Sequence, residues 1–245
     1  MFPKIVFSDF DGTLTDGDLL SRTFFDVLDL IDKNNSKLII VTGRPLSWGH
    51  FFMTHSTLPI CITEGGGMLS KKNDSEGFED ICLVNDAIIN SFKQFLDIFK
   101  KTFPNMSFSN DSKSRVTDRA IELSAINENG IKEKLLSFLK DHEINYSCSN
   151  VHLNFWKGNI SKDRAVKFCL ENFFPSIKQN DCIYFGDSLN DESMFKYFTH
   201  TVGVSNIKNV LDNLGYRPSQ ILEGNELAEI KGVFSVLSDL DQRNN

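Results

Sequence analysis

Acidic residues follow two short apolar runs at distant points of the chain. Asp9 and Asp11 come directly after one run, within Asp-Phe-Asp-Gly-Thr-Leu-Thr, and Asp187 and Asp191 come after another. An apolar run too short for a helix and ended by Asp or Gly is typical of a buried strand. Carboxylates gathered at strand ends supply the oxygen ligands that Mg²⁺ prefers, and their mutual repulsion favours a cation. One Asp can then attack a phosphoryl group while a second serves as acid and base.

Two further segments are suited to binding phosphate. Thr42 and Gly43 end the apolar run 38–41, and a helix with Pro45 in its first turn would aim its amino terminus at the same place. Ser161 is a good amino-terminal cap for a helix that has Lys162 in its first turn. A lysine there is electrostatically unfavourable unless it binds an anion. Taken singly, the first segment is also compatible with a plain turn and the lysine with a solvated side chain.

The order of the remaining segments predicts an α/β fold with a doubly wound, mainly parallel sheet. Apolar runs predict strands, and amphipathic stretches predict helices between them. The predicted strands are 5–7, 38–41, 60–62, 182–185 and 201–204, and the predicted helices are 21–33, 45–55, one from 161, and 226–240. In open α/β sheets the ligand lies at the carboxyl ends of the strands, which is where the acidic residues fall.

A second pattern interrupts this order and predicts an inserted α+β cap. Residues 71–80 are polar and turn-like, and they mark the first boundary. A helix over 88–103, a strand near 120–124, a helix over 131–140 and strands at 146–148 and 151–156 are predicted after it. The expected domains are therefore a core of residues 1–71 and 159–245 and a cap of residues 72–158.

The last cap strand alternates between apolar and polar side chains. Alternation places Val151, Leu153 and Phe155 on a packed face and leaves an open face. The open-face residues are His152, Asn154 and Trp156, with Glu122 on a neighbouring strand. Polar groups beside one indole can bind a sugar, because the ring covers C–H groups while the polar atoms bind hydroxyls. A solvated sheet face is the alternative interpretation.

Bulk composition indicates an ordinary globular protein. The 245 residues are 40% hydrophobic, enough for a core and a smaller domain, and the net charge is −7. This charge, without a long basic run, argues against nucleic acid or an anionic membrane as partner. The five cysteines form no Cys-x-x-Cys pair, so free thiols in a reducing compartment are expected. Without a signal peptide or membrane-spanning run, we expect a cytoplasmic monomer or homodimer.

Four separated motifs together resemble the haloacid dehalogenase superfamily of phosphohydrolases. They are D-F-D-G-T-L-T from Asp9, V-T-G-R around Thr42, G-N-I-S-K-D containing Lys162, and G-D-S-L-N-D from Gly186. The cap between the second and third motifs is similar to the type IIB branch, which includes mannosyl-3-phosphoglycerate, sucrose and trehalose phosphate phosphatases. T-E-G-G-G from Thr63 resembles an E-N-G-G stretch of the first of these, with Gly65 in place of Asn.

The resemblance implies a role for each motif residue. Asp9 would be the nucleophile that becomes an aspartyl phosphate, and Asp11 the general acid and then base. The phosphoryl oxygens would be held by Thr42, Gly43 and Lys162. Mg²⁺ would be bound by Asp9, by the backbone carbonyl of Asp11 and by Asp187, and Asp191 would support these ligands. Candidates for substrate contact are Arg44, Glu122, His152, Asn154, Trp156 and Asn190. The implied activity is Mg²⁺-dependent hydrolysis of a small phosphomonoester, a sugar phosphate above all.

Two other functions fit the same motifs. A phosphomutase of the phosphomannomutase type resembles this chain in its cap and first motif, but carries Gly-Gly-Ser where this chain has Thr-Gly-Arg. It would also need cap arginines for a second phosphate, for which Arg115 and Arg119 are candidates. The third function is a noncatalytic phosphosugar-binding regulator. Retention of every catalytic carboxylate argues against it, because unused buried acids cost stability.

Overall fold

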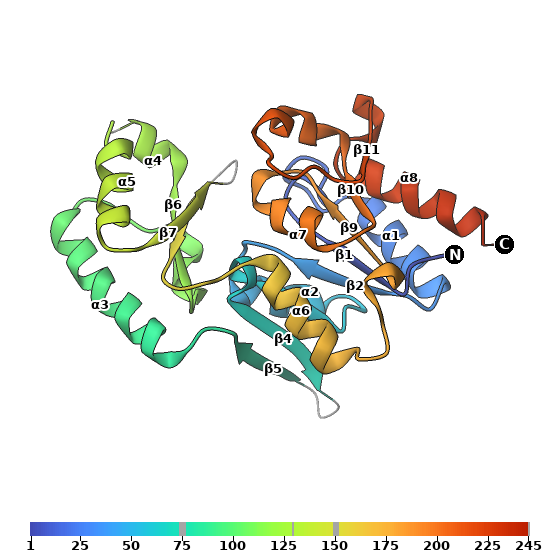
Figure 1. The fold of residues 1–245 in the computed structure, drawn as a ribbon, viewed down its shortest axis with the longest axis horizontal. Coiled ribbons are helices and arrows are strands. Elements are labelled where there is room, and N and C mark those ends of the chain that lie inside the picture. Colours follow the sequence, from blue (N-terminus) through green and yellow to red (C-terminus); the bar gives the residue numbers. More distant parts are fainter. Residues whose placement is uncertain (74–76, 129, 149–151, 245) are drawn as a thin grey trace.

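A large twisted sheet forms the centre of the molecule (Figure 1). The computed structural model describes all residues except 74–76, 129, 149–151 and 245. Eight of the described strands form this sheet in the order β11-β10-β9-β1-β2-β3-β4-β5. They are β1 (Ile5–Ser8), β2 (Lys37–Val41), β3 (Ile60–Thr63), β4 (Met68–Asn73), β5 (Gly77–Cys82), β9 (Cys182–Gly186), β10 (Thr201–Gly203) and β11 (Gln220–Ile221). The strands from β11 to β3 are parallel, which confirms the predicted fold class.

Helices cover both faces of the parallel strands. The helices of the core are α1 (Arg22–Lys33), α2 (Leu46–Thr54), α6 (Lys162–Phe173), α7 (Glu192–Tyr197) and α8 (Glu229–Gln242). Apolar side chains of α1, α2 and α8 pack with Val6 on one face, and those of α6 and α7 pack with Phe7 on the other. Since both faces are covered, the central strands are buried throughout, as parallel sheets require.

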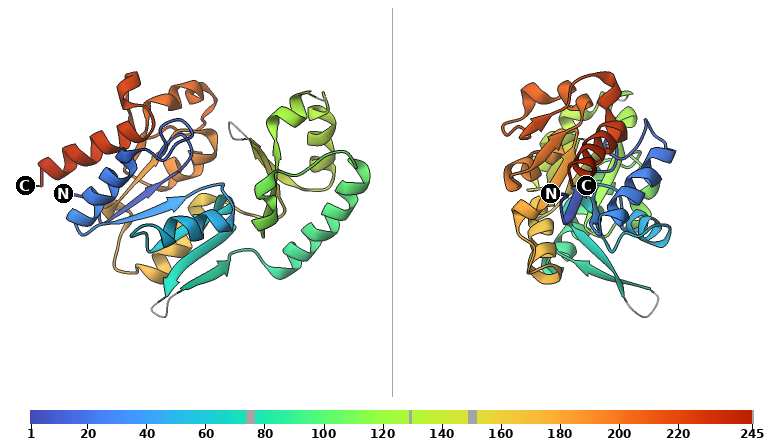
Figure 2. Two further views of the ribbon diagram at one scale, coloured as in Figure 1. Left: turned by 180° about the vertical axis from the view of Figure 1, so that it is seen from behind. Right: turned by 90° about the vertical axis from the view of Figure 1, so that its right-hand side faces the viewer.

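The cap is a smaller layer beside the main sheet (Figure 2). Its strands β6 (Asp118–Glu122), β8 (His152–Trp156) and β7 (Asn145–Cys148) form an antiparallel sheet in that order. The helices α3 (Asp86–Thr102), α4 (Leu123–Glu128) and α5 (Lys132–Asp141) lie on the side away from the core. Phenylalanines of α3 and β8 fill the interior between helices and sheet. The opposite side of the cap sheet faces the carboxyl ends of the core strands.

Short 3-10 segments connect many of these elements. They are η1 (Glu64–Gly66), η2 (Asn110–Ser114), η3 (Gln179–Asp181), η4 (Leu189–Asp191), η5 (Ser205–Asn209), η6 (Leu211–Asn213) and η7 (Asn225–Leu227). Within the described residues, no helix combines the length and the apolar composition needed to cross a bilayer.

The polar segment marked as the first boundary in the sequence contains parts of two strands of the main sheet. Of the residues expected to lead into the cap, 72–73 belong to β4 and 77–80 to β5, and these antiparallel strands extend the main sheet. Its edge is polar, with Lys71 paired to Glu79 at 3.0 Å, as exposed edge strands usually are. We therefore propose that the cap begins after Cys82.

Strands β6 and β8 of the cap correspond to two of the predicted strands. The strand expected at 120–124 is β6 (Asp118–Glu122), and helix α4 begins at Leu123. Leu153 and Phe155 are fully buried, as the alternation predicted. Val151, the third residue assigned to that face, lies outside the described residues.

Candidate active site

Neighbouring parallel strands bring the predicted carboxylates together. Asp9 follows β1 and Asp187 follows β9, and the two strands pair directly in parallel. The backbone N–H of Asp9 donates to the carbonyl of Phe185 at 2.9 Å, which fixes the relative height of the two strand ends. One carboxylate oxygen from each of Asp9, Asp187 and Asp191 lies within 4.8 Å of the other two, and all three residues are buried. Asp9 and Asp187, which are 178 positions apart in the sequence, thus belong to one cluster.

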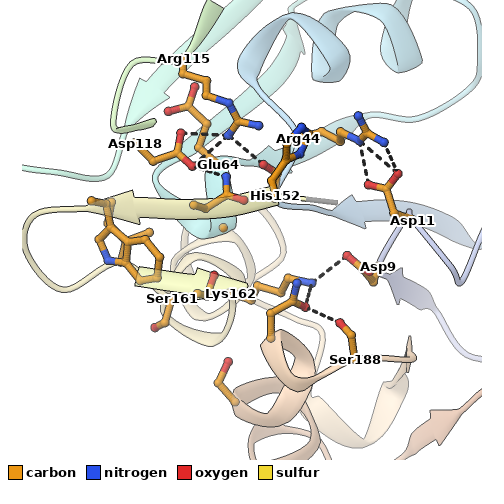
Figure 3. A pocket seen from close by; sticks show the side chains of 18 residues that line it. Asp9, Asp11, Arg44, Glu64, Arg115, Asp118, His152, Ser161, Lys162 and Ser188 are labelled. Atoms are coloured by element: carbon orange, nitrogen blue, oxygen red, sulfur yellow. Dashed lines mark hydrogen bonds and ion pairs between the residues drawn. The ribbon is translucent and has the colours of Figure 1, made fainter. Parts of the chain in front are cut away.

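Lys162 is the cation of this cluster. From the first turn of α6, its Nζ donates to Asp9 Oδ1 at 2.7 Å (Figure 3). It also donates to Asp191 Oδ1 at 2.6 Å and to Asn190 Oδ1 at 2.9 Å. Burial lowers the pKa of this ammonium, but Asp191 and Asp9 raise it further than burial lowers it. Lys162 therefore stays protonated although it is buried.

One lysine does not balance three carboxylates. Burial raises the pKa of Asp9 to about 7; Lys162 opposes that rise and Asp191 adds to it. Burial, then the charges of Asp9 and Asp191, also raise the pKa of Asp187 well above its ordinary value. A group of hard oxygen donors with excess negative charge fits Mg²⁺. Asp9 and Asp187 are the residues that would hold it.

Asp191 has more protein donors than the other two carboxylates. Its Oδ1 accepts from Lys162 and from the hydroxyl of Tyr184 at 2.5 Å, and its Oδ2 accepts from the backbone N–H groups of Asp187 and Ser188 at 3.0 Å. We propose that Asp191 orients Lys162 and the Asp187 loop, which corresponds to the supporting role predicted for it. For Tyr184 the sequence predicts only a position in a core strand. A tyrosine in a buried strand is a usable signal, because its hydroxyl needs a partner.

Asp187 is oriented by two residues that the sequence did not reveal. Thr13 Oγ1 donates to its Oδ1 at 3.0 Å, and Asn206 Nδ2 donates to its Oδ2 at 2.9 Å. The same amide of Asn206 donates to the carbonyl of Gly12 at 2.9 Å. Thr13 belongs to the first motif, whereas Asn206 lies in η5 and carries no motif. The loop after β9 is thereby tied to the loop after β1.

The second motif lies beside the first. Thr42 is buried after β2, and its Oγ1 accepts from the backbone N–H of Arg44 at 3.0 Å. The Arg44 side chain reaches Asp11 and binds both oxygens of its carboxylate. Gly43 lies on the cavity wall between them, with no heavy atom near the place of a missing Cβ. Space for a phosphoryl group is thus next to Gly43.

A cavity of about 240 Å³ opens between these loops and the cap. The core contributes Asp9, Asp11, Gly43, Arg44, Lys162 and Asn190 to its lining. Of the predicted open face of the cap, His152, Asn154 and Trp156 line it too. Glu122 does not: its Oε1 contacts His152 Nε2 at 3.0 Å from outside. Glu122 can therefore influence the cavity only through that imidazole.

Cap arginines do not extend freely into this cavity. Arg115 donates to both oxygens of Asp118, to Asp111 and to the carbonyl of Gly43, with its side chain only 1% exposed. Arg119 Nη1 donates to the carbonyls of Arg115 and Asp118. Arg115 lies on the cavity wall but is already neutralised by two carboxylates. The charge of this guanidinium on the cavity wall is therefore already balanced by carboxylates of the cap.

Solved structures show the same architecture at low sequence identity. A haloacid dehalogenase-like hydrolase from Bacteroides thetaiotaomicron is 18% identical, with a TM-score of 0.71 and coverage of 97% of this chain and 99% of that one. The sucrose-phosphatase from Synechocystis, solved with sucrose and phosphate, is 14% identical with a TM-score of 0.67, covering 98% and 99% of the two chains. A Thermotoga maritima protein is 19% identical with a TM-score of 0.66, covering 98% and 97%. These likenesses show the fold.

A family comparison goes further than the fold. No curated protein matches the sequence. The model of the haloacid dehalogenase-like hydrolases, in contrast, matches residues 6–81 and 77–214, which include all four motifs and the whole cap. The chain therefore belongs to the haloacid dehalogenase-like hydrolase family.

Proposed function

We propose that this protein is a Mg²⁺-dependent phosphatase that hydrolyses a small phosphomonoester, with a sugar phosphate as the class of substrate. The observation that carries the proposal is the placement of Asp9. Its carboxylate is bound by Lys162 at one end of a cavity whose other wall is the polar, indole-bearing face of the cap. A nucleophile, a fixed cation and a recognition surface thus share one enclosed space.

The residues of the chain suggest how the reaction would proceed. A carboxylate oxygen of Asp9 attacks phosphorus, and the bond from phosphorus to the leaving oxygen breaks. Lys162 stays protonated and stabilises charge on the phosphoryl oxygens beside Thr42 and Gly43. Asp11 gives its proton to the leaving alkoxide, then takes one from the water that hydrolyses the aspartyl phosphate. Mg²⁺, when bound, would supply further neutralisation of the same phosphoryl charge.

The cap face supports a hydroxyl-rich leaving group. Asn154 and Asp118 both line the cavity, and Asn154 Nδ2 donates to Asp118 Oδ2 at 2.9 Å. Trp156 Nε1 is buried and has no hydrogen-bond partner among the described residues. The residue itself lines the cavity, where its ring can cover the C–H groups of a sugar while neighbouring polar atoms bind hydroxyls. The fold likeness to a sucrose-phosphatase is consistent with this proposal.

The mutase alternative requires cap arginines that bind a second phosphate, and both candidates already have partners. A second phosphate would have to displace Asp111 and Asp118 from Arg115, and both pairs have distances of 2.9 Å. Arg119 is bound to backbone carbonyls rather than to the cavity. Hydrolysis of a monophosphate therefore fits the described residues better than transfer within a bisphosphate.

The test is phosphate release from a panel of phosphosugars, phosphoglycerate derivatives and nucleotides, with Mg²⁺ or with chelator. We expect Mg²⁺-dependent release concentrated on sugar monophosphates. Asp9→Asn should bind the same substrates without releasing phosphate, whereas Asp18→Asn, at an exposed position, should behave like the unaltered protein. Product formed only with a sugar bisphosphate would favour the mutase. Binding without turnover by the unaltered protein would favour a regulator.

A further inference from the structure

Glu64 is a buried acid for which the proposed reaction has no use. It follows β3, is the second residue of the T-E-G-G-G segment, and is 1% exposed. Its φ is +54°, in the left-handed region that costs a residue with a Cβ about 1 kcal/mol or more. A strained, buried carboxylate persists only where the surrounding structure demands it.

The carboxylate of Glu64 binds the cap. Its oxygens accept from the backbone N–H of Val116 at 3.0 Å, from the backbone N–H of Thr117 at 2.6 Å and from Thr117 Oγ1 at 2.7 Å. Val116 and Thr117 lie between η2 and β6, far along the chain from both covalent connections between core and cap. Burial, followed by the charge of Asp118, raises the pKa of Glu64, and the bonds from Thr117 and Val116 oppose that rise.

A second contact lies beside the first. Arg115 Nη1 donates to the carbonyl of Gly43 at 3.0 Å, and the same guanidinium binds Asp118. Asp118 in turn accepts from Asn154, which lines the cavity. We call the contacts of Glu64 with residues 116–117 and of Arg115 with Gly43 the cap joint. Through Asp118, the cap joint is connected to the substrate-facing side of β8 (Figure 3).

The glycines after Glu64 make this approach sterically feasible. A Cβ on Gly67 would overlap the side chain of Thr117, and a Cβ on Gly66 would overlap the carbonyl of Ser161, just before Lys162. Gly66 also has a φ of +106°. Glycine is therefore required at both positions. The two contacts explain two of the three consecutive glycines, which lack the features of a phosphate-binding loop, and the third, Gly65, has a φ of +63°.

We infer that Glu64 is a positioning residue: through the cap joint it holds the recognition face of the cap in register with the phosphate-binding loop. A cap attached only by its two covalent connections would rotate about them. Bonds from two backbone N–H groups to one buried carboxylate restrain it at a third point. The part of the inference that concerns substrate selection rests on the proposed phosphatase function.

Hydrogen exchange tests the cap joint without any reaction. In the unaltered protein, the amides of Val116 and Thr117 should exchange slowly. In Glu64→Gln they should exchange at least about tenfold faster, because the amide group loses the charge and one acceptor. Glu229→Gln is the matched control: Glu229 also has a positive φ, of +54°, and accepts from a backbone N–H, that of Gly17, away from the cap. Fast exchange in the unaltered protein, or equal exchange in Glu64→Gln, would overturn the inference.

Kinetics test what the cap joint does for selection. We measure kcat/KM for the preferred sugar phosphate and for p-nitrophenyl phosphate, whose leaving group lacks hydroxyls. Their ratio should fall about tenfold in Glu64→Gln, since small misplacements of binding groups have effects of this size. Thr117→Val, which removes only one hydroxyl donor, should move the ratio in the same direction by less. An unchanged ratio in both variants would refute the role in selection. If the unaltered protein releases no phosphate, the proposed function fails, and hydrogen exchange still decides on the cap joint.

Discussion

Arg44 binds both carboxylate oxygens of Asp11, with Nε 2.8 Å from Oδ2 and Nη2 2.5 Å from Oδ1. The guanidinium carbon also lies 4.3 Å from the centre of the Trp48 ring, so a cation–π contact supports it from the side. Because Arg44 directly follows Gly43, one side chain connects the predicted phosphate loop to the predicted acid and base.

The first prediction concerns this pair. Arg44→Lys keeps the charge but cannot offer two parallel N–H groups to Asp11. We expect kcat for the preferred phosphomonoester to fall about tenfold or more, because Asp11 loses its fixed orientation. Steady-state kinetics on purified protein would measure it, with the exposed Arg22→Lys as the control. A change confined to KM would assign Arg44 to substrate binding alone.

The second prediction concerns Gly12, whose φ is +78°. A Cβ at this position would overlap Oδ2 of Asp187. Gly12→Ala should therefore displace Asp187, weaken Mg²⁺ binding about tenfold or more and abolish most activity. Gly17→Ala is the matched control, because Gly17 has a φ of +60° and open space around it. In this variant only the free energy of unfolding should change, falling by about 1 kcal/mol because a residue with a Cβ disfavours the left-handed backbone conformation.

Isothermal titration with Mg²⁺ and urea unfolding together separate the two effects. Equal Mg²⁺ affinity in the two glycine variants would show that contact with Asp187 does not matter. It would also weaken the assignment of Asp187 as a ligand of the cation.

The third prediction concerns pH. The pKa of Asp9 is raised from 3.8 to about 7 in the folded protein, chiefly by burial. Between these values the folded state binds more protons than the unfolded state, so the stability contributed by Asp9 falls as pH rises through this window. For one proton the slope is at most about 1.4 kcal/mol per pH unit. Urea unfolding in chelator, from pH 5 to 7, should show this loss.

Asp9→Asn and Mg²⁺ are the two controls for this pH effect. The variant has no proton to lose at this position, so the difference in unfolding free energy between it and the unaltered protein should change with pH. Saturating Mg²⁺ favours the ionised carboxylate and should reduce the slope. A difference that stays constant from pH 5 to 7 would contradict the raised pKa.

The fourth prediction concerns recognition by the cap. Trp156→Ala removes the aromatic face and Asn154→Ala removes an amide from the cavity wall. Each should lower kcat/KM for the preferred sugar phosphate, Asn154→Ala by about tenfold for a lost hydrogen bond of 1–1.5 kcal/mol, and should affect p-nitrophenyl phosphate less. His152→Ala should behave similarly, and Glu122→Ala more weakly, because Glu122 acts only through His152. An unchanged substrate profile in all four variants would refute the interpretation of this face.

Much of the fold follows from local patterns in the sequence. Strands such as β1 and β9 are continuous apolar runs because both of their faces are covered, and such runs stand out in any reading. The carboxyl ends of adjacent parallel strands then bring Asp9 and Asp187 together without further information. The hairpin β4–β5 was not predicted, for the opposite reason. Near the edge of the sheet many of its side chains are polar, at 70–73 and 79–80, and a polar stretch of sequence resembles a turn region.

Contacts between distant side chains could not be predicted in the same way. Tyr184, Asn206 and Glu64 owe their roles to partners reached through the tertiary fold, and no spacing rule connects Glu64 to Thr117. Arg115 shows the reverse case. Its type suggested a free phosphate-binding cation, but Asp111 and Asp118 already surround it. The residue type determines which interactions a side chain can make. Its neighbours in the folded protein determine whether the side chain is available to make them with a ligand.

The phenylalanine-rich interior of the cap has a consequence for how the molecule comes apart. Its buried side chains, from Phe92 to Phe155, form a cluster separate from the two that flank the main sheet. Regions that share few buried contacts tend to open as separate cooperative units. We therefore expect mild heat or urea to melt the cap first. The protein would then become an indiscriminate hydrolase before it became an unfolded one.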